Sequence, residues 1–483
     1  MTRLNNHSRH VAVIGGGITG LAAAHRLLEL DPSIRVTLLE ASSRLGGVLE
    51  TVQRDGFTVE QSADNFITNV PWAIDLCRRL GLTDQLQPTS DRHRRAFVVF
   101  RGRLEPIPEG FLIMAPSRVG PVLRTPILSP LGKLRLLGEL FVPARKNVGD
   151  ESLASFVSRR LGRETYQRLV QPLVGGIYTA DPEKLSVEAT MPRFLKMERT
   201  HGSLIRAAWR QAKARDKTQN GAGARYSMFM ALRGGMSSLV DALAARLPSD
   251  SLLLNTSVST IKQEPAGGWS LHVAGDSLER LAVDAVIVAT PAHQAARLLS
   301  ELDGDLARHL RQIQYASCAV VSLGYRREQI GHPLDGFGFV TPSIERRQIL
   351  SGSFSSVKYP GRAPDGCELL RVFIGGACQP ELVDLPDDRL LETAKQEIAS
   401  LLSVTGDVLF QDIRRWRSTM PQYHVGHVRL VAKLQAQAER FPGLKLAGNA
   451  YSGVGVPHCI HSGEQAAEAI VTIPTEKPAY STC

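Results

Sequence analysis

Residues 11–20 read VAVIGGGITG, a four-residue apolar run that passes directly into a glycine-rich turn. An apolar run that ends at a tight turn predicts a β-strand buried on both faces. Residues 21–28 read LAAAHRLL and predict a helix whose small side chains face the sheet. Strand, turn and helix therefore follow in the order of a dinucleotide-binding βαβ unit.

The three spaced glycines of the turn have different physical roles. Gly15 permits the tight turn, Gly17 lets the backbone approach a pyrophosphate, and Gly20 lets the helix pack closely on the strand. A second strand is expected at residues 35–39, and it ends at Glu40. An acid at this point accepts hydrogen bonds from both ribose hydroxyls, which argues against a 2′-phosphate. The complete unit predicts a bound dinucleotide rather than an ordinary glycine-rich turn.

The length and composition limit the classes of protein to which this chain can belong. The chain has 483 residues, of which 43% are hydrophobic and 22% charged, so we expect a globular protein of two to four domains. The six cysteines form no C-x-x-C pair, and we expect neither a metal site nor a disulfide framework. No apolar stretch reaches the ~18 residues that a membrane-spanning helix needs. The N-terminal residues lack the apolar stretch of a secretory signal. We therefore expect a cytoplasmic protein.

The net charge of +10 is concentrated in two segments. Residues 91–149 carry eleven basic against four acidic residues, and residues 192–225 carry nine against two. This concentration predicts a surface or cleft facing an anion, which could be a carboxylated substrate, a lipid headgroup or a nucleic acid. The alternative is a solvated basic face without a partner.

Further strands and a helix are expected in the second half of the chain. Alternating runs at 252–261, 269–273 and 283–289 predict a β-meander, and residues 444–449 predict a strand before a helix at 462–470.

Two long insertions separate these blocks. Residues 111–225 are mainly helical in period, and their last part, 211–224, is expected to be a mobile loop. Residues 293–440 mix strand-like runs such as 318–325 with a helix at 388–402. We expect the second insertion to form a roof over a substrate.

A second motif begins at the ribose acid. Residues 40–47 read EASSRLGG and resemble a signature of the flavin oxidase group that includes amine oxidases, carotene desaturases and protoporphyrinogen oxidases. In that group the arginine, here Arg44, sits by the cofactor's phosphates, and the glycine pair lets the chain pass close to the flavin. The resemblance implies that the dinucleotide is FAD rather than NAD.

Four further segments narrow the resemblance, and with the N-terminus they span nearly the whole chain. They read GIYTADPEKLS at 176–186, PRFLKMERTHGSL at 192–204, WRSTMPQYHVGH at 416–427 and GNAYSGVGVPHCIHSG at 448–463. These segments resemble the oxygen-dependent protoporphyrinogen and coproporphyrinogen III oxidase family of the haem pathway. One departure is EQSADNF at 60–66, where the glycine and proline of the family's turn are replaced.

The resemblance implies a set of cofactor contacts. They fall on Gly15, Gly16, Gly17, Ile18, Thr19, Gly20, Glu40, Arg44, Gly47, Val48, Ser62, Ala63, Asp64, Asn65, Val258, Trp416, Asn449, Val454, Gly455 and Val456.

Candidate substrate residues are fewer. Gly176 is expected to let a backbone carbonyl meet a pyrrole N–H, unless it is an ordinary turn glycine. Arg95 is the candidate for binding a propionate. Phe337 and Phe339 are candidate roof aromatics, although strand aromatics are more often core residues.

The resemblance also implies the reaction. It is the FAD-dependent oxidation of coproporphyrinogen III or protoporphyrinogen IX to the porphyrin in haem biosynthesis, with molecular oxygen as acceptor. Six electrons leave in about three flavin cycles, each producing hydrogen peroxide, and no side chain has to act as a catalytic acid or base. The basic segments favour the substrate with more carboxylates, coproporphyrinogen III.

The expected fold is α/β, with a Rossmann-like FAD-binding domain and β-meander interrupted by a substrate domain and a mainly helical domain. The expected boundaries are 1–90, 226–292 and 441–475 for the FAD-binding domain, 91–110 and 293–440 for the substrate domain, and 111–225 for the basic helical domain.

Two other functions remain open from the sequence. An amine or polyamine oxidase of the same fold would need an acidic mouth, which the basic segments disfavour. A non-catalytic module that binds nucleic acid is disfavoured by the complete dinucleotide motif. Apolar and basic residues alternate at 111–148, so we expect a mainly soluble protein with at most peripheral membrane contact. The sequence leaves the oligomeric state undetermined.

Overall fold

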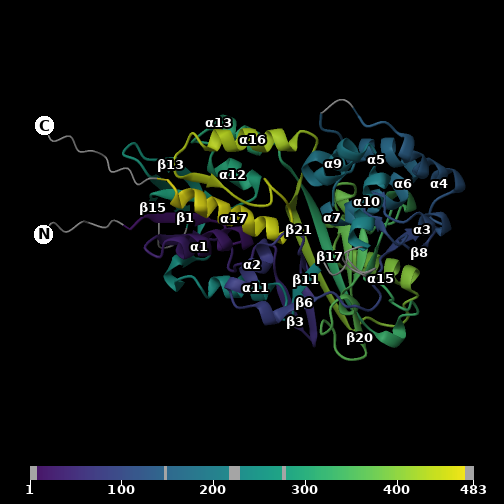
Figure 1. The fold of residues 1–483 in the computed structure, drawn as a ribbon. Coiled ribbons are helices and arrows are strands. Elements are labelled where there is room, and N and C mark those ends of the chain that lie inside the picture. Colours follow the sequence, from purple (N-terminus) through teal and green to yellow (C-terminus); the bar gives the residue numbers. More distant parts are fainter. Residues whose placement is uncertain (1–7, 146–148, 217–228, 275–278, 474–483) are drawn as a thin grey trace, which may run out of the picture.

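The computed structural model of the protein describes residues 8–145, 149–216, 229–274 and 279–473. Figure 1 shows helices and a parallel sheet from both ends of the chain on one side, and long strands with a group of helices on the other. The mixed α/β fold expected from the sequence is confirmed.

The parallel sheet joins segments that are far apart in the sequence. Its strand order is β12 (Leu252–Leu253), β2 (Arg35–Leu39), β1 (His10–Ile14), β16 (Ala285–Val288) and β22 (Leu444–Leu446). Helices α1 (Ile18–Leu30), α2 (Trp72–Arg79), α11 (Ser237–Ala244) and α17 (Val456–Val471) pack with one face. Helices α12 (Ala292–Leu298), α13 (Gly304–Leu310) and α16 (His427–Ala438) pack with the other.

Strand β1 shows why its sequence is apolar without alternation. Val11 and Val13 point into the core beside α1 and α17, while Ala12 and Ile14 point into the core beside α12. All four residues are buried because helices or strands cover both faces. The strands predicted at 11–14 and 35–39 are confirmed.

The β-meander differs from the prediction in its third strand. It consists of β13 (Ser257–Gln263), β14 (Trp269–Ala274) and β15 (Arg280–Val283). The expectation that residues 283–289 form its third strand is wrong, because Ala285–Val288 is strand β16 of the parallel sheet. Its four residues are all buried, as expected of a strand with both faces covered.

A second, seven-stranded sheet forms the other half of the molecule. Its order is β21 (Phe410–Gln422), β17 (Gln314–Arg326), β20 (Cys367–Gly375), β19 (Ser351–Phe354), β18 (Gly338–Val340), β7 (Phe97–Phe100) and β8 (Arg103–Pro106). Helix α15 (Asp387–Leu402) packs with one face of this sheet, which confirms the helix predicted at 388–402. The strand predicted at 318–325 lies within β17.

Small sheets and short elements connect the two halves. They are β3 (Thr51–Arg54) with β4 (Phe57–Glu60), β5 (Phe66–Ile67) with β11 (Phe229–Leu232) and β6 (Leu86–Pro88), and the short helix α14 (Ser355–Lys358).

Helices dominate between β8 and β11. After the hairpin of β9 (Phe111–Leu112) and β10 (Ala115–Pro116) come α3 (Val119–Arg124), α4 (Pro130–Leu137), the 3₁₀ turn η2 (Gly138–Phe141), α5 (Leu153–Leu161), α6 (Arg163–Thr165), the π-turn η3 (Tyr166–Val170), α7 (Gln171–Tyr178), α8 (Val187–Thr190), α9 (Pro192–His201) and α10 (Leu204–Asp216). The loop expected at 211–224 is wrong for residues 211–216, which continue α10, and its remainder lies outside the described residues.

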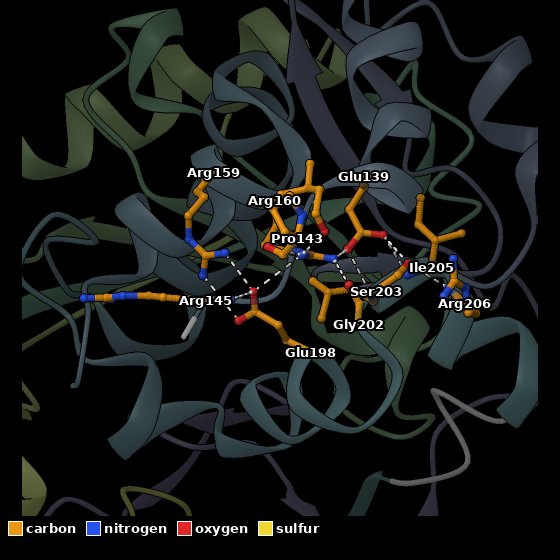
Figure 2. Close-up of polar contacts among 12 residues, drawn as sticks. Glu139, Pro143, Arg145, Arg159, Arg160, Glu198, Gly202, Ser203, Ile205 and Arg206 are labelled. Carbon is orange, nitrogen blue, oxygen red and sulfur yellow. Dashed lines mark hydrogen bonds and ion pairs between the residues drawn. The ribbon is translucent and has the colours of Figure 1, made fainter. Parts of the chain in front are cut away.

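A buried ion network holds these helices together (Figure 2). Arg160 and Glu139 form an ion pair, and both side chains are fully buried. Glu139 also accepts a hydrogen bond from Ser203 Oγ at 2.5 Å. Glu198 accepts from Arg159 Nη1 at 2.7 Å and from Arg160 Nη1 at 3.4 Å. The network therefore ties η2, α5, α9 and the start of α10 to one another.

Neutralising Glu139 should destabilise the protein strongly. In the Glu139→Gln variant the buried Arg160 loses its closest carboxylate and keeps only the Glu198 contact at 3.4 Å. Breaking a buried ion pair costs about 3–5 kcal/mol. Urea denaturation followed by tryptophan fluorescence measures the loss. The matched control is Glu109→Gln, which removes the partner of Arg118 from a pair that is more than half exposed. That control should lose less than about 1 kcal/mol. Equal losses in both variants would contradict this account of the network.

Candidate cofactor and substrate site

The glycine-rich turn after β1 is built so tightly that two of its glycines cannot carry a side chain. Gly15 has φ +108°, and an added Cβ would lie 2.7 Å from the Ala289 carbonyl oxygen. A Cβ on Gly20 would collide with the carbonyl oxygen of Gly15. These two glycines are required by the fold itself, whatever the turn binds.

Gly17 is different, because the space beside it is open. An added Cβ there would meet only the Gly47 Cα, at 3.9 Å. Gly46 donates its backbone N–H to the Gly16 carbonyl at 2.8 Å, so the two glycine motifs face one another. An open stretch of backbone at the start of α1 is what a pyrophosphate requires. The residues present therefore fit the predicted dinucleotide.

Glu40 lies at the end of β2, where the sequence places it. Its Oε2 accepts from the Gly16 backbone N–H at 2.6 Å, and its Oε1 accepts from Ser42 N–H at 2.8 Å and Ser42 Oγ at 2.7 Å. These bonds fix the carboxylate beside the glycine turn. A carboxylate offers about four acceptor positions, so it can still accept from a ribose hydroxyl.

Arg44 organises the loop that carries the second glycine motif. Its guanidinium donates to the carbonyls of Gly47 at 2.6 Å, Leu45 at 3.1 Å and Leu49 at 3.2 Å. It therefore fixes the path of Gly47 and of Val48, both of which are exposed. The contact between Arg44 and cofactor phosphates stays a prediction.

The segment 62–65 joins this loop to the seven-stranded sheet. Ser62 Oγ donates to the Val48 carbonyl at 2.5 Å, and Arg371 donates to the Ser62 carbonyl. Lys358 Nζ lies 3.0 Å from an Asp64 carboxylate oxygen. Burial would raise the pKa of Asp64, but Lys358 and Arg371 outweigh it, so the pKa lies below its ordinary value.

The other two predicted residues of this segment make local contacts. Asn65 Nδ2 donates to Asp64 Oδ1 at 2.6 Å, and Ala63 packs against the core around α1 and α17. The replaced glycine and proline have thus not prevented a well-bonded turn.

The C-terminal half of β21 contacts the same region. Trp416 Nε1 donates to the Gln61 carbonyl at 2.7 Å, next to the segment 62–65. Asn449 Nδ2 donates to the Thr419 carbonyl at 3.4 Å, which connects β21 to the loop before α17. Gly455 is the N-cap of α17, and Val456 is its first residue. The structure therefore brings the N-terminal, central and C-terminal predicted residues together through a continuous chain of contacts.

Tyr423, which was not among the predicted site residues, holds the loop before α17. Its buried hydroxyl donates to the Asn449 carbonyl and accepts from the Gly453 N–H at 2.9 Å. The His427 ring stacks on the tyrosine with centroids 4.0 Å apart. Burial lowers the pKa of His427 to about 4, so the stacked imidazole is neutral near pH 7. Tyr423 positions a loop that the predicted cofactor site shares.

The two predicted valines differ in burial. Val258 is buried among the meander residues, so any contact it makes with a cofactor must come mainly from its backbone. Val454 is half-buried and packs against the cluster of the helical segment, and its contact with a cofactor stays a prediction.

The second face of the seven-stranded sheet points toward this region. Strand register aligns five residues in one row across the sheet, namely Arg414, Val320, Phe373, Ser351 and Val340. They alternate along their strands with the residues that pack against α15, so they lie on the other face. Trp416 and Arg371 lie on the same face and bind Gln61 and Ser62, as described above. This row includes Phe373, a half-buried aromatic that sequence reasoning missed.

Phe339 lies on the opposite face, so its assignment to the substrate roof is wrong. Its ring is 2% exposed and packs in the core beside α15, 6.1 Å from the Phe354 ring. Successive strand residues point to opposite faces, and its neighbour Val340 lies on the face that carries Ser351 and Phe373. Phe337 is also buried. Arg95 is half exposed and forms an ion pair with Asp335, and its role in binding a propionate stays a prediction.

Gly176 lies over the face of the sheet that carries Val340 and Ser351. It is exposed near the end of α7, and an added Cβ would lie 3.4 Å from Val340 Cγ1 and 4.0 Å from Ser351 Oγ. The adjacent Ile177 side chain is also exposed. A contact between Gly176 and a macrocycle stays a prediction.

A Rossmann-type sheet with an open glycine turn and a carboxylate after its second strand, contacted by one face of a second sheet, is typical of a nucleotide-dependent oxidoreductase. The chain belongs to the flavin containing amine oxidoreductase family, whose profile matches residues 18–471. A flavin held by a dinucleotide-binding unit is FAD, so the cofactor expected from the sequence is confirmed.

The relatives extend over almost the whole chain. Coproporphyrinogen III oxidase of Bacillus subtilis (strain 168) is 32% identical over 474 residues, which cover 97% of this chain and 99% of that protein. The protein of the same name from Propionibacterium freudenreichii subsp. freudenreichii is 35% identical, covering 96% and 90%. A crystal structure of an Exiguobacterium sp. 255-15 protein, provisionally named a protoporphyrinogen oxidase, superposes with a TM-score of 0.85 at 29% identity, covering 96% and 98%.

A side chain at Gly17 should abolish FAD binding while leaving the protein folded. The Cβ of Gly17→Val would meet no protein atom closer than 3.9 Å, and the side chain would enter the place expected for the pyrophosphate. The purified variant should lack flavin absorbance yet retain wild-type far-UV circular dichroism. The control is Gly304→Val, at another helix start with no atom within 4 Å of an added Cβ. A Gly17→Val protein with a full complement of FAD would show that the pyrophosphate lies elsewhere.

Proposed function

We propose that the protein oxidises a porphyrinogen, coproporphyrinogen III or protoporphyrinogen IX, to the corresponding porphyrin in haem biosynthesis. The observation that carries this proposal is the near-complete coverage of two coproporphyrinogen III oxidases at 32% and 35% identity. Three of the four segments that resemble the family, those with Gly176, Trp416 and Asn449, contain residues discussed for the candidate site above.

The reaction balances with molecular oxygen as the acceptor. A porphyrinogen loses six hydrogens, so one porphyrin corresponds to about three molecules each of oxygen consumed and hydrogen peroxide formed. When bound, FAD supplies the two-electron acceptor chemistry. The protein has to bind the macrocycle, orient one bridge carbon at a time and exclude water.

Different residues of the chain perform the binding and positioning steps. Backbone N–H groups near Gly17 bind the pyrophosphate and Glu40 accepts from the ribose, while Tyr423 fixes the loop before α17. Gly176 leaves room for the macrocycle above the sheet face that carries Phe373. No side chain needs to act as an acid or base, because hydrogens can shift between bridge carbons within the substrate.

Turnover with both porphyrinogens tests the proposal. The holoenzyme should convert at least one of them to a fluorescent porphyrin, with about three peroxide molecules formed per ring. We expect a higher kcat/KM for coproporphyrinogen III, because each propionate that meets a partly desolvated cation gains a charge-assisted hydrogen bond. Formation of no porphyrin, with rapid oxidation of a polyamine such as putrescine, would replace the proposal by the amine oxidase alternative.

We also propose that the protein works in the cytoplasm and contacts membranes peripherally. None of the helices in the described ranges is long and apolar enough to cross a bilayer. Leu131, Leu134 and Phe141 are 78%, 66% and 87% exposed on neighbouring parts of α4 and η2. Exposed basic residues accompany them, including Arg124 and Arg135. Apolar side chains beside cations suit the interface of an anionic leaflet.

Co-sedimentation with vesicles measures this contact. Holoenzyme should bind vesicles rich in phosphatidylglycerol at low salt and bind phosphatidylcholine vesicles less, because each cation near an anionic surface adds about 1 kcal/mol. The Leu131→Ser/Leu134→Ser/Phe141→Ser variant should lose binding. The control Leu409→Ser changes an exposed leucine elsewhere and should bind as wild type. No binding of the wild type to anionic vesicles would rule the contact out.

A further inference from the structure

A cavity of ≈ 280 Å³ opens between α9, α10 and strand β10. Its wall combines two kinds of side chain. Ala115, Phe194 and Met197 are buried and form an apolar floor. Arg193 and Lys196, one helical turn apart on α9, are exposed and bring two positive charges to the wall. A cavity of this composition suits an apolar molecule that carries a carboxylate at its edge.

The cations have a rigid support. Arg193 lies over the Phe194 ring, with its Cζ 4.6 Å from the ring centroid. The inner side of the same helix is anchored by Glu198, which binds Arg159 and Arg160 in the buried network (Figure 2). Because α9 is fixed from inside, the backbone that carries the two cations does not have to reorder when a ligand binds.

Helix α9, which lines the cavity, is bonded at its start to the helix that carries Gly176. The Tyr178 hydroxyl donates to the Thr190 carbonyl at 3.3 Å, just before α9 begins. Burial raises the pKa of Tyr178 to about 12 and the nearby Arg193 opposes the rise, so the two residues are electrostatic neighbours. Tyr178 follows Gly176 by two residues on α7, and its carbonyl accepts a hydrogen bond at 3.3 Å from Gln422, the last residue of β21.

We infer, on the basis of the proposed function, that this cavity receives a propionate that coproporphyrinogen III carries and protoporphyrinogen IX lacks, with Arg193 and Lys196 as the cations that bind it. The cavity is too small for a whole macrocycle and suits a substituent at its edge. Coproporphyrinogen III has four propionates and protoporphyrinogen IX has two. Arg193 and Lys196 are thereby residues that determine specificity for the more highly carboxylated substrate.

The test compares Arg193→Gln/Lys196→Gln holoenzyme with wild type on both porphyrinogens. The variant should lose about 10- to 100-fold in kcat/KM for coproporphyrinogen III, mainly through KM. Its kcat/KM for protoporphyrinogen IX should change by less than about threefold. The matched control is Arg199→Gln/Arg206→Gln, which removes the same charge from exposed positions of α9 and α10 outside the cavity. That control should keep the wild-type preference, and Lys196→Gln alone serves if the double variant is unstable.

A binding measurement separates this inference from the proposed function. Quenching of coproporphyrin III and protoporphyrin IX fluorescence by the holoenzyme gives an affinity for each product without turnover. The double variant should lose affinity for coproporphyrin III selectively, together with part of its salt dependence. Equal changes for both porphyrins, or no change for either, would overturn the inference. If the wild type oxidises neither porphyrinogen, the proposed function fails. The binding measurement then shows by itself whether the cavity binds propionates.

Discussion

The cofactor end of the molecule depends on one close approach between backbone segments. Helix α1 starts so near the turn after β1 that a Cβ on Gly20 would collide with the Gly15 carbonyl. On the far side of α1, Gly463 of α17 comes equally close to the Thr19 carbonyl. The helix is thus held between its own strand and the C-terminal helix. This packing leaves the backbone at Gly17 open to a pyrophosphate.

The same packing explains why distant segments share one site. Strand β22 adds the C-terminal part of the chain to the edge of the parallel sheet, and α17 then returns to α1. The loop between them is bonded to Tyr423 of the segment after β21. The loop before α17 therefore cannot move independently of the sheet that faces the substrate region.

Buried and exposed charged side chains have different roles in this molecule. Inside the helical segment, the fully buried Arg160 and Glu139 are paired with each other and bonded to Glu198 and Ser203. A buried pair of this kind fixes helix positions rather than adding much net stability. Near the cofactor region, Arg371 and Lys358 keep Asp64 ionised and connect its segment to the sheet. On the outside of α9, Arg193 and Lys196 stay at the surface, where they can meet an anion.

The sequence by itself determined the βαβ unit, Glu40 and the FAD assignment, because spaced glycines and a buried strand are local constraints on the backbone. It could not determine that residues 285–288 leave the meander, since a short apolar run looks alike in either sheet. Phe339 was placed on the wrong face because strand alternation gives two faces without saying which one α15 covers. Tyr423 and the Arg193–Lys196 cavity depend on contacts between distant segments, and only tertiary packing brings those segments together.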